Sequence, residues 1–291
     1  MSYDLWSAES EDDIATMSSF SKIPSRHHFL VIAAASRGAR FFVKKALRQG
    51  HSVTALCRAQ DDDGALARMQ ALLAETKLAE GGLPPAPVEG QLRASSRSIL
   101  DPETYRLLLM RDPAIDRVCC FVGVVGLSQM MSRSQKLYTQ TIGALIEGMG
   151  ASRYVEFFYH GSSGLEGPPG SSEPALPANF SPKWLLNLGL KIPAAQDCFD
   201  SEGLLAQAAA SGLKFVVFRP AWLTTAPAKR SYGYCFDTTS MDNEMLPLRD
   251  AKTTISREDV AEEILRVATL PGDERDRWFG HGVYLVDLVR P

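Results

Sequence analysis

HFLVIAAASRGARFFVKKALRQGHSVTALCR, residues His28–Arg58, is the stretch that decides the fold. Its apolar run Phe29–Ile32 predicts a buried strand, and the small residues 33–39 predict a tight turn. Apolar residues then recur at helical spacing until Gly50, which can end a helix. A second apolar run, Val53–Leu56, predicts the next strand. Strand, turn, helix and strand in this order form the first half of a nucleotide-binding sheet, in which a pyrophosphate lies on the helix N-terminus.

Length, charge and composition narrow the class of protein. The 291 residues suit one large α/β domain, or one domain with a small substrate-binding lobe. The net charge of −3 gives no basic field for nucleic acid or for an anionic membrane. No apolar run reaches the ~18–20 residues that a membrane helix needs. The acidic N-terminus resembles neither a secretory signal nor a typical transit peptide. We therefore expect a cytoplasmic protein with residues 1–25 as an N-terminal tail.

The five cysteines indicate packing rather than metal or disulfide chemistry. None lies in a C-x-x-C pair, and no Cys/His cluster has the spacing of metal ligands. Cys119 and Cys120 lie inside an apolar run, where a free cysteine acts as a small hydrophobic residue. The cysteine pattern predicts a reduced protein with buried thiols and no metal site.

Candidate strands and helices alternate along the rest of the chain, which predicts a Rossmann-like, doubly wound parallel sheet of the α/β class. The further predicted strands cover 88–92, 117–125, 154–159 and 213–218, and the further predicted helices cover 65–80, 101–110, 134–150 and 197–210. Ser256 is a suitable N-cap for a last long helix. We assign 26–291 to one domain, with a small C-terminal substrate lobe contributed mainly by 165–195 and 222–255.

Four landmarks make the chain resemble the short-chain dehydrogenase/reductase superfamily, in its extended and atypical (NmrA-like) branches. They are the opening strand–helix–strand unit, 154–164 (YVEFFYHGSSG), 213–223 (LKFVVFRPAWL) and 255–265 (ISREDVAEEIL). The resemblance covers most of the chain from about residue 28. It implies an NAD(P)-binding Rossmann fold, whereas a fold alone does not establish an activity.

The resemblance places the glycine-rich turn of that superfamily, G-x-x-G-x-x-G, on Ala33, Ser36 and Ala39. A shift of one residue would let Gly38 serve as one of the three. Those glycines allow the tight turn, the approach of the backbone to the phosphates and close helix–strand packing. Cβ atoms at Ala33 and Ser36 can fill the space of the pyrophosphate, although Ser36 can also donate its hydroxyl and Arg37 adds positive charge. Two interpretations stay open: a modified dinucleotide site, or a retained fold with a closed site.

Arg58 follows the second predicted strand, where the family places the residue that contacts the adenosine ribose. An Asp there accepts from the 2′-hydroxyl and indicates NAD, whereas an Arg pairs with a 2′-phosphate and indicates NADP. We therefore expect NADP as the cofactor, bound by the turn residues, by Arg58 and by Gly123 in the central run 117–125. The alternative for Arg58 is an ordinary solvated surface arginine.

The catalytic residues of the resemblance are only partly present. Family members that transfer hydride commonly use a Ser after the fifth strand and then Tyr-x-x-x-Lys. Ser163 matches the Ser position, but 192–205 (IPAAQDCFDSEGLL) has no such pair. Tyr159 and His160, at the end of the fifth strand, are substitute proton donors. The alternatives are a core aromatic for Tyr159 and a histidine bonded to backbone for His160.

The sequence is compatible with two functions. The first is an NADP(H)-dependent oxidoreductase acting on a carbonyl, imine or activated alkene of a small organic substrate. The second is a degenerate member without hydride transfer: a dinucleotide sensor, a scaffold subunit of a larger complex, or a cofactor-free cyclase or isomerase. The altered turn and the absent Tyr/Lys pair favour the second. The first leads because many atypical members also lack that pair. Whether the chain forms a homodimer or joins a larger assembly stays open.

Overall fold

The computed structural model describes residues 26–80, 89–123, 136–150, 155–161, 193–236 and 254–287. The strands of the main sheet are β1 (His28–Ile32), β2 (Ser52–Leu56), β3 (Leu92–Ser95), β4 (Ile115–Cys120), β5 (Glu156–His160), β6 (Lys214–Pro220), β8 (Tyr232–Phe236) and β10 (His281–Asp287). A second, two-stranded sheet consists of β7 (Trp222–Thr224) and β9 (Thr254–Ser256). The helices are α1 (Arg37–Arg48), α2 (Asp62–Glu75), α3 (Pro102–Arg111), α5 (Leu137–Met149), α7 (Pro193–Ala209), α8 (Arg257–Thr269) and α9 (Gly272–Asp276).

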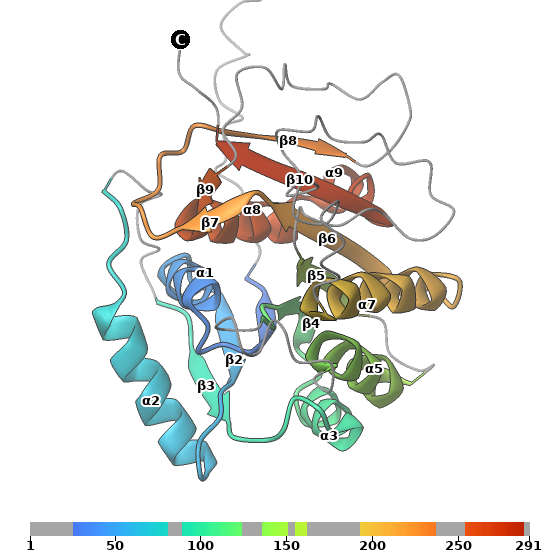
Figure 1. Ribbon diagram of the computed structural model, residues 1–291. Helices are drawn as coiled ribbons and strands as arrows, with labels where there is room; N and C mark the ends of the chain where they lie inside the picture. Colours follow the sequence, from blue (N-terminus) through green and yellow to red (C-terminus); the bar gives the residue numbers. More distant parts are fainter. Residues whose placement is uncertain are drawn as a thin grey trace, which may run out of the picture.

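The main sheet has the strand order β3-β2-β1-β4-β5-β6-β10-β8 and lies between two layers of helices (Figure 1). Its strands pair in parallel, except that β8 runs antiparallel to β10. The order runs outward in both directions from the β1–β4 pair, which is where such sheets bind ligands at their carboxyl edge. The Rossmann-like α/β class that the alternating pattern predicts is confirmed.

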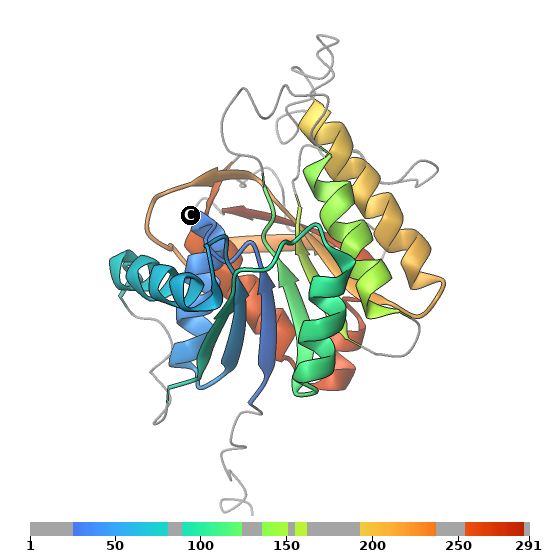
Figure 2. The same cartoon turned by 90° about the horizontal axis from the view of Figure 1, so that it is seen from below.

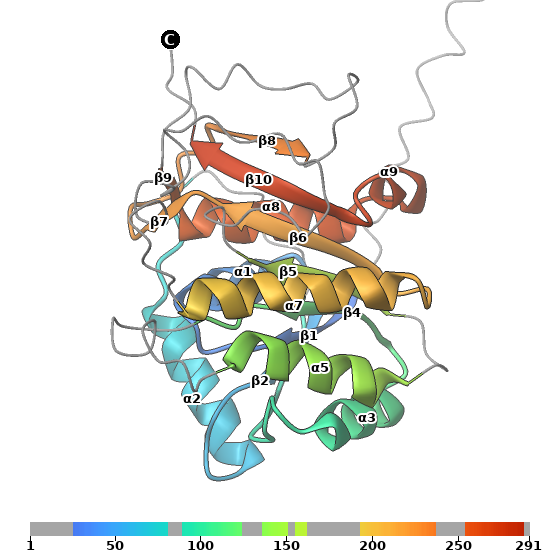
Figure 3. The same ribbon diagram turned by 45° about the vertical axis from the view of Figure 1, so that its right-hand side comes forward.

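Within the described ranges, helices cover both faces of the sheet. α1, α2 and α8 enclose one hydrophobic cluster, which includes Phe42 and Ile264. α3, α5 and α7 enclose the other, which includes Tyr105 and Leu145. Figure 2 shows α1 and α2 on one side of the strands and α3, α5 and α7 on the other, and Figure 3 shows the latter three side by side. Because both faces are buried, the central strands have continuous apolar runs, as Val118–Cys120 does in β4.

The sequence patterns misplace some peripheral elements. β3 lies at Leu92–Ser95 instead of 88–92, because Gly90 passes against the backbone of His51, where a Cβ would lie 1.6 Å from the His51 carbonyl oxygen. β8, which lies within 222–255, joins the main sheet, whereas β7 and β9, at the two ends of the same range, form the second sheet. β10 was not anticipated. Residues 1–25, 165–192 and 237–253, which hold the tail and most of the expected lobe, lie outside the described residues.

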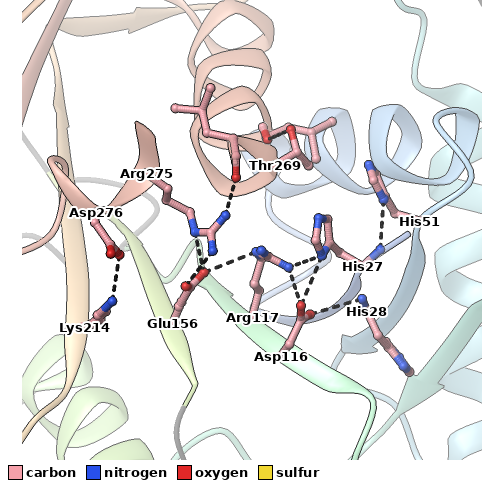
Figure 4. A network of polar contacts seen from close by, with 12 residues as sticks. His27, His28, His51, Asp116, Arg117, Glu156, Lys214, Thr269, Arg275 and Asp276 are labelled. Atoms are coloured by element: carbon pink, nitrogen blue, oxygen red, sulfur yellow. Dashed lines mark hydrogen bonds and ion pairs between the residues drawn. The ribbon is translucent and has the colours of Figure 1, made fainter. Parts of the chain in front are cut away.

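A buried ionic network closes the amino edge of the sheet, at the starts of β4 and β5 (Figure 4). Arg117 is 4 % exposed and contacts Asp116, and its Nε lies 3.4 Å from Glu156 Oε2. Arg275 of α9 binds both oxygens of the same carboxylate, at 2.8 and 2.9 Å. The network therefore joins α9 to two central strands at the edge opposite the carboxyl ends.

Two histidines continue this network towards β2 (Figure 4). The backbone N–H of His27 donates to Nδ1 of His51 at 3.2 Å, and the two rings stack with centroids 5.5 Å apart. His51 is 3 % exposed, and Phe29 packs edge-on against its ring. Burial, followed by the charges of His27 and Arg117, lowers the pKa of His51 to about 4. His51 is therefore a neutral acceptor in the folded protein at neutral pH.

No helix in the described ranges combines the length and the apolar character that crossing a bilayer requires.

Candidate functional site

The turn after β1 keeps the backbone shape that a glycine usually provides. Ala33 has a φ of 57°, in the left-handed region that a Cβ disfavours. Its carbonyl accepts the Ser36 N–H at 2.9 Å, and its methyl packs against the hydrophobic cluster of the α3/α5/α7 face. A Cβ at Gly38, by contrast, would meet only the Phe121 ring at an ordinary 3.5 Å. Among the turn positions, Ala33 is thus the one whose backbone calls for glycine.

We expect Ala33→Gly to stabilise the fold by about 0.5–1 kcal/mol. Relief of the left-handed strain is worth roughly 1–2 kcal/mol and exceeds the ~0.5–1 kcal/mol entropic cost of glycine. The matched control is Ala34→Gly, since Ala34 is buried and has no positive φ. That control should lose roughly 1 kcal/mol. Urea unfolding of both variants checks the assignment, which fails if Ala33→Gly is as destabilising as Ala34→Gly.

The N-terminus of α1 presents positive charge next to this turn. Ser36 is the N-cap, and its Oγ accepts the N–H of buried Ala39 at 3.3 Å. The N–H groups of Arg37 and Gly38 are among those that a helix start leaves without an intrahelical partner. α1 has no acidic residue in its first turn, and Arg37 is exposed. These residues fit a diphosphate group, which backbone donors and the helix dipole would stabilise.

The residues after β4 form the adjoining wall of the site. The Phe121 ring lies 5.4 Å from the Phe42 ring and 5.7 Å from that of His160, measured between centroids. Gly123 is exposed, and a Cβ on it would lie 3.9 Å from the Tyr138 hydroxyl. The expected cofactor residue Gly123 therefore does lie at the carboxyl edge. It faces a tyrosine of α5 that the sequence analysis did not single out.

At the end of β2, Arg58 is exposed, and within the described ranges no carboxylate pairs with it. The neighbouring acids make other contacts. Asp61 caps α2 by accepting the Gly64 N–H at 2.7 Å. Asp62 accepts the Ser96 N–H at 2.7 Å, and this hydrogen bond is the main cause of its lowered pKa. The arginine is thus the side chain that this strand end offers to a ligand.

The two substitute proton donors lie on opposite faces of β5. Tyr159 is fully buried on the α7 side, and its hydroxyl lies 3.0 Å from Ser201 Oγ and 3.6 Å from Cys198 Sγ. Burial raises the pKa of Tyr159 well above its ordinary value. The structure therefore contradicts the role of Tyr159 as an accessible proton donor and favours the core aromatic.

His160 is partly exposed and lies on the α1/α8 side, beside Phe121. Burial lowers its pKa to about 4, with a smaller contribution in the same direction from Arg257. At neutral pH it is a neutral ring that can hydrogen-bond a ligand but carries no proton as imidazolium. Ser163, the expected partner of the reacting oxygen, lies outside the described residues.

A buried ion pair supports the strand ends beside this site. Arg219 and Glu202 are each 2 % exposed, and the Arg219 guanidinium donates to Glu202 Oε2 at 2.6 and 3.1 Å. Arg219 Nη1 also donates to the Tyr284 hydroxyl at 3.2 Å. A Cβ at Gly161 would lie 3.1 Å from Glu202 Oε1, so α7 closely approaches the end of β5. The pair joins α7, β6 and β10.

Arg257 is a residue that the sequence analysis missed. It is the first residue of α8, after the Ser256 N-cap. The charge of Arg37 lowers the pKa of Arg257, and the charge of Arg257 lowers the pKa of His160. The N-cap signal was visible in the sequence. What the sequence does not show is that α8 packs beside α1, although 220 positions separate their first residues.

Comparison with known proteins supports the fold. No family model and no curated protein matches the sequence. A short-chain dehydrogenase/reductase (wide type) from Veillonella parvula, solved in complex with NADP, has a TM-score of 0.59 at 14% identity over 92% of this chain and 99% of that chain. An oxidoreductase from Lactococcus lactis has a TM-score of 0.54 at 12% identity, over 89% and 90%.

The terminal R domain of the myxalamid biosynthetic pathway is also similar, with a TM-score of 0.61 at 15% identity over 92% of this chain and 67% of that chain. At such identities these structures show the fold alone. The chain thus has the fold of NAD(P)-binding Rossmann proteins, as the resemblance to atypical short-chain dehydrogenases/reductases implies.

Proposed function

We propose that this protein, whose fold is that of NAD(P)-binding Rossmann proteins, is a cytoplasmic NADP(H)-dependent oxidoreductase of a small organic substrate. The observation that carries the choice of cofactor is the end of β2, where Arg58 is exposed and the neighbouring Asp61 and Asp62 bind backbone groups. An arginine at this position can pair with a ribose 2′-phosphate.

When bound, NADP(H) would supply or accept the hydride. The chain itself would hold the diphosphate at the α1 N-terminus, through the N–H groups of Arg37 and Gly38. His160, neutral at pH 7, would orient a substrate by a hydrogen bond rather than protonate it as imidazolium. We retain Ser163 as the group that hydrogen-bonds the reacting oxygen, on the resemblance alone.

We expect Arg58→Ala to weaken NADPH binding roughly 10- to 100-fold, since a charge-assisted contact to the 2′-phosphate contributes about 1.5–3 kcal/mol. NADH lacks that phosphate, so its affinity serves as the internal control and should change less than about twofold. Fluorescence or calorimetric titration of both nucleotides checks this. An equal effect on NADPH and NADH would exclude Arg58 as the specificity residue.

A second candidate is a dinucleotide-binding protein without hydride transfer, such as a sensor or a scaffold subunit. The observation that favours it is α7, whose Pro193–Ala209 segment contains neither a tyrosine nor a lysine, while Tyr159 is buried. NADPH consumption with a panel of carbonyl, imine and activated alkene acceptors separates the two. Turnover supports the oxidoreductase, and binding without turnover on any acceptor class supports the second candidate.

A further inference from the structure

Two helices that are far apart in the sequence begin side by side at the carboxyl edge. α1 and α8 pack along one face of the sheet (Figure 1). Each has a serine N-cap, Ser36 or Ser256, and each has an arginine, Arg37 or Arg257, as its first residue. β9 pairs with β7 immediately before Arg257, which fixes the start of α8. Two cationic side chains thus adjoin two positive helix ends.

The two arginines interact as like charges. Burial lowers the pKa of Arg257, and the nearby charge of Arg37 lowers it further. Arg257 in turn contributes to the lowered pKa of His160. Across the ranges that the structure describes, no carboxylate forms an ion pair with Arg37 or Arg257. An anion bound between the two guanidinium groups would be attracted by both and would offset their mutual repulsion.

The acids nearest to Arg257 along the chain face other partners. Glu258, which is 1 % exposed, lies 3.0 Å from Lys45 Nζ and accepts the Ala79 N–H at 3.1 Å. Asp259, which is fully buried, accepts the N–H groups of Lys229 and Arg230 at 3.0 and 2.9 Å.

Both carboxylates are therefore held by backbone and lysine groups. Arg257, in the first turn of α8, is therefore available to a ligand.

We propose that Arg257 is a second phosphate-binding residue, and that Arg37 and Arg257 together hold the diphosphate of the dinucleotide between the N-termini of α1 and α8. This inference rests on the proposed function for the identity of the ligand. The anion site itself rests on the paired arginines. The same chemistry would accept free pyrophosphate or the diphosphate of another ligand, so the test uses both NADPH and inorganic pyrophosphate.

The test compares full-length protein with Arg257→Gln, Arg257→Lys and Arg37→Gln by calorimetric titration. Arg48→Gln is the matched control, because it removes the same charge at the opposite end of α1. We expect Arg257→Gln and Arg37→Gln each to weaken both probes about tenfold. Arg257→Lys should retain most of the affinity, because it keeps the charge, and Arg48→Gln should change it less than twofold. Unchanged thermal unfolding of each variant confirms that it is folded.

A second readout is independent of affinity. The pKa of His160, followed by NMR of its ring protons, should rise above about 4 when pyrophosphate binds and also in Arg257→Gln. If Arg257 served in packing alone, pyrophosphate binding would not change the pKa of His160.

The outcomes separate the role of Arg257 in phosphate binding from the proposed NADP(H)-dependent function. If NADPH binds the wild type and Arg257→Gln leaves its affinity unchanged, the role of Arg257 is overturned while the proposed function stands. If pyrophosphate binds through both arginines and NADPH does not bind or compete, the anion site stands and the dinucleotide assignment falls. If neither probe binds the wild type, both fall.

Discussion

Replacing Glu202 with leucine is expected to lower the free energy of unfolding by about 3–5 kcal/mol, because it removes the buried carboxylate that binds the Arg219 guanidinium. Both side chains are 2 % exposed, and the two contacts at 2.6 and 3.1 Å join α7 to β6. Removing one partner of such a pair costs far more than the pair itself contributes, because the remaining charge cannot regain its hydration. Urea unfolding measures the loss.

Two further variants make this prediction specific. The double variant Glu202→Leu/Arg219→Met removes both charges and should recover at least half of the loss. Asp276→Asn is the matched control, because it breaks an ion pair with Lys214 at the start of the same strand, where both side chains are exposed. It should cost less than about 1 kcal/mol. A Glu202→Leu variant as stable as Asp276→Asn would contradict a stabilising role for the buried Glu202–Arg219 pair.

Stability is expected to fall as the pH is lowered from about 6.5 to about 4. The pKa of His51 is about 4 in the folded protein against an ordinary 6.5, so the unfolded chain binds more protons in this window. The contribution is fully present above pH 6.5, and it is lost progressively down to the folded pKa. For His51 alone it amounts to about 3 kcal/mol. The lowered pKa values of His28 and His160 act in the same direction.

His51→Asn tests the source of this acid sensitivity. An asparagine Oδ1 can accept the His27 N–H that Nδ1 of His51 accepts at 3.2 Å, and it does not titrate. The variant should be less stable than the wild type at pH 7, because ring packing on Phe29 is lost. Its stability should also vary less with pH. Denaturant unfolding between pH 4.5 and 7 gives the slope of stability against pH for the wild type and for the variant. Equal slopes would show that His51 is not the source of the acid sensitivity.

The sequence predicted the central elements well because each carries a complete local signal. Phe29–Ile32 is apolar throughout, as a strand buried on both faces requires, and it forms β1. Ser256 is followed by acidic residues, and it caps α8. β8 lacked such a signal, because an antiparallel edge strand is selected by its neighbours. There Tyr234 and Phe236 pack against Trp278, with ring centroids 4.8 and 4.9 Å apart. β10, which lies between β6 and β8, was missed although it carries the buried apolar run Val283–Val286.

Within the candidate site, the sequence predicted where a residue lies along its strand, turn or helix. It did not predict which way the side chain points or which distant residues lie beside it. Ala33 was placed correctly in the turn, and its φ of 57° shows why a glycine belongs there. The directions of Tyr159 and His160 could not be read, because adjacent strand residues face opposite layers and the sequence does not say which layer holds the ligand. Arg257 was missed because it comes near Arg37 and His160 only through the packing of α8 beside α1.

We propose that the altered turn after β1 still binds a nicotinamide dinucleotide. Titration of the purified wild-type protein with NADPH and with NADH tests it most directly, by calorimetry or by nicotinamide fluorescence. We expect micromolar binding of NADPH and weaker binding of NADH. Binding of neither nucleotide would contradict the oxidoreductase function and would favour a retained fold with a closed site.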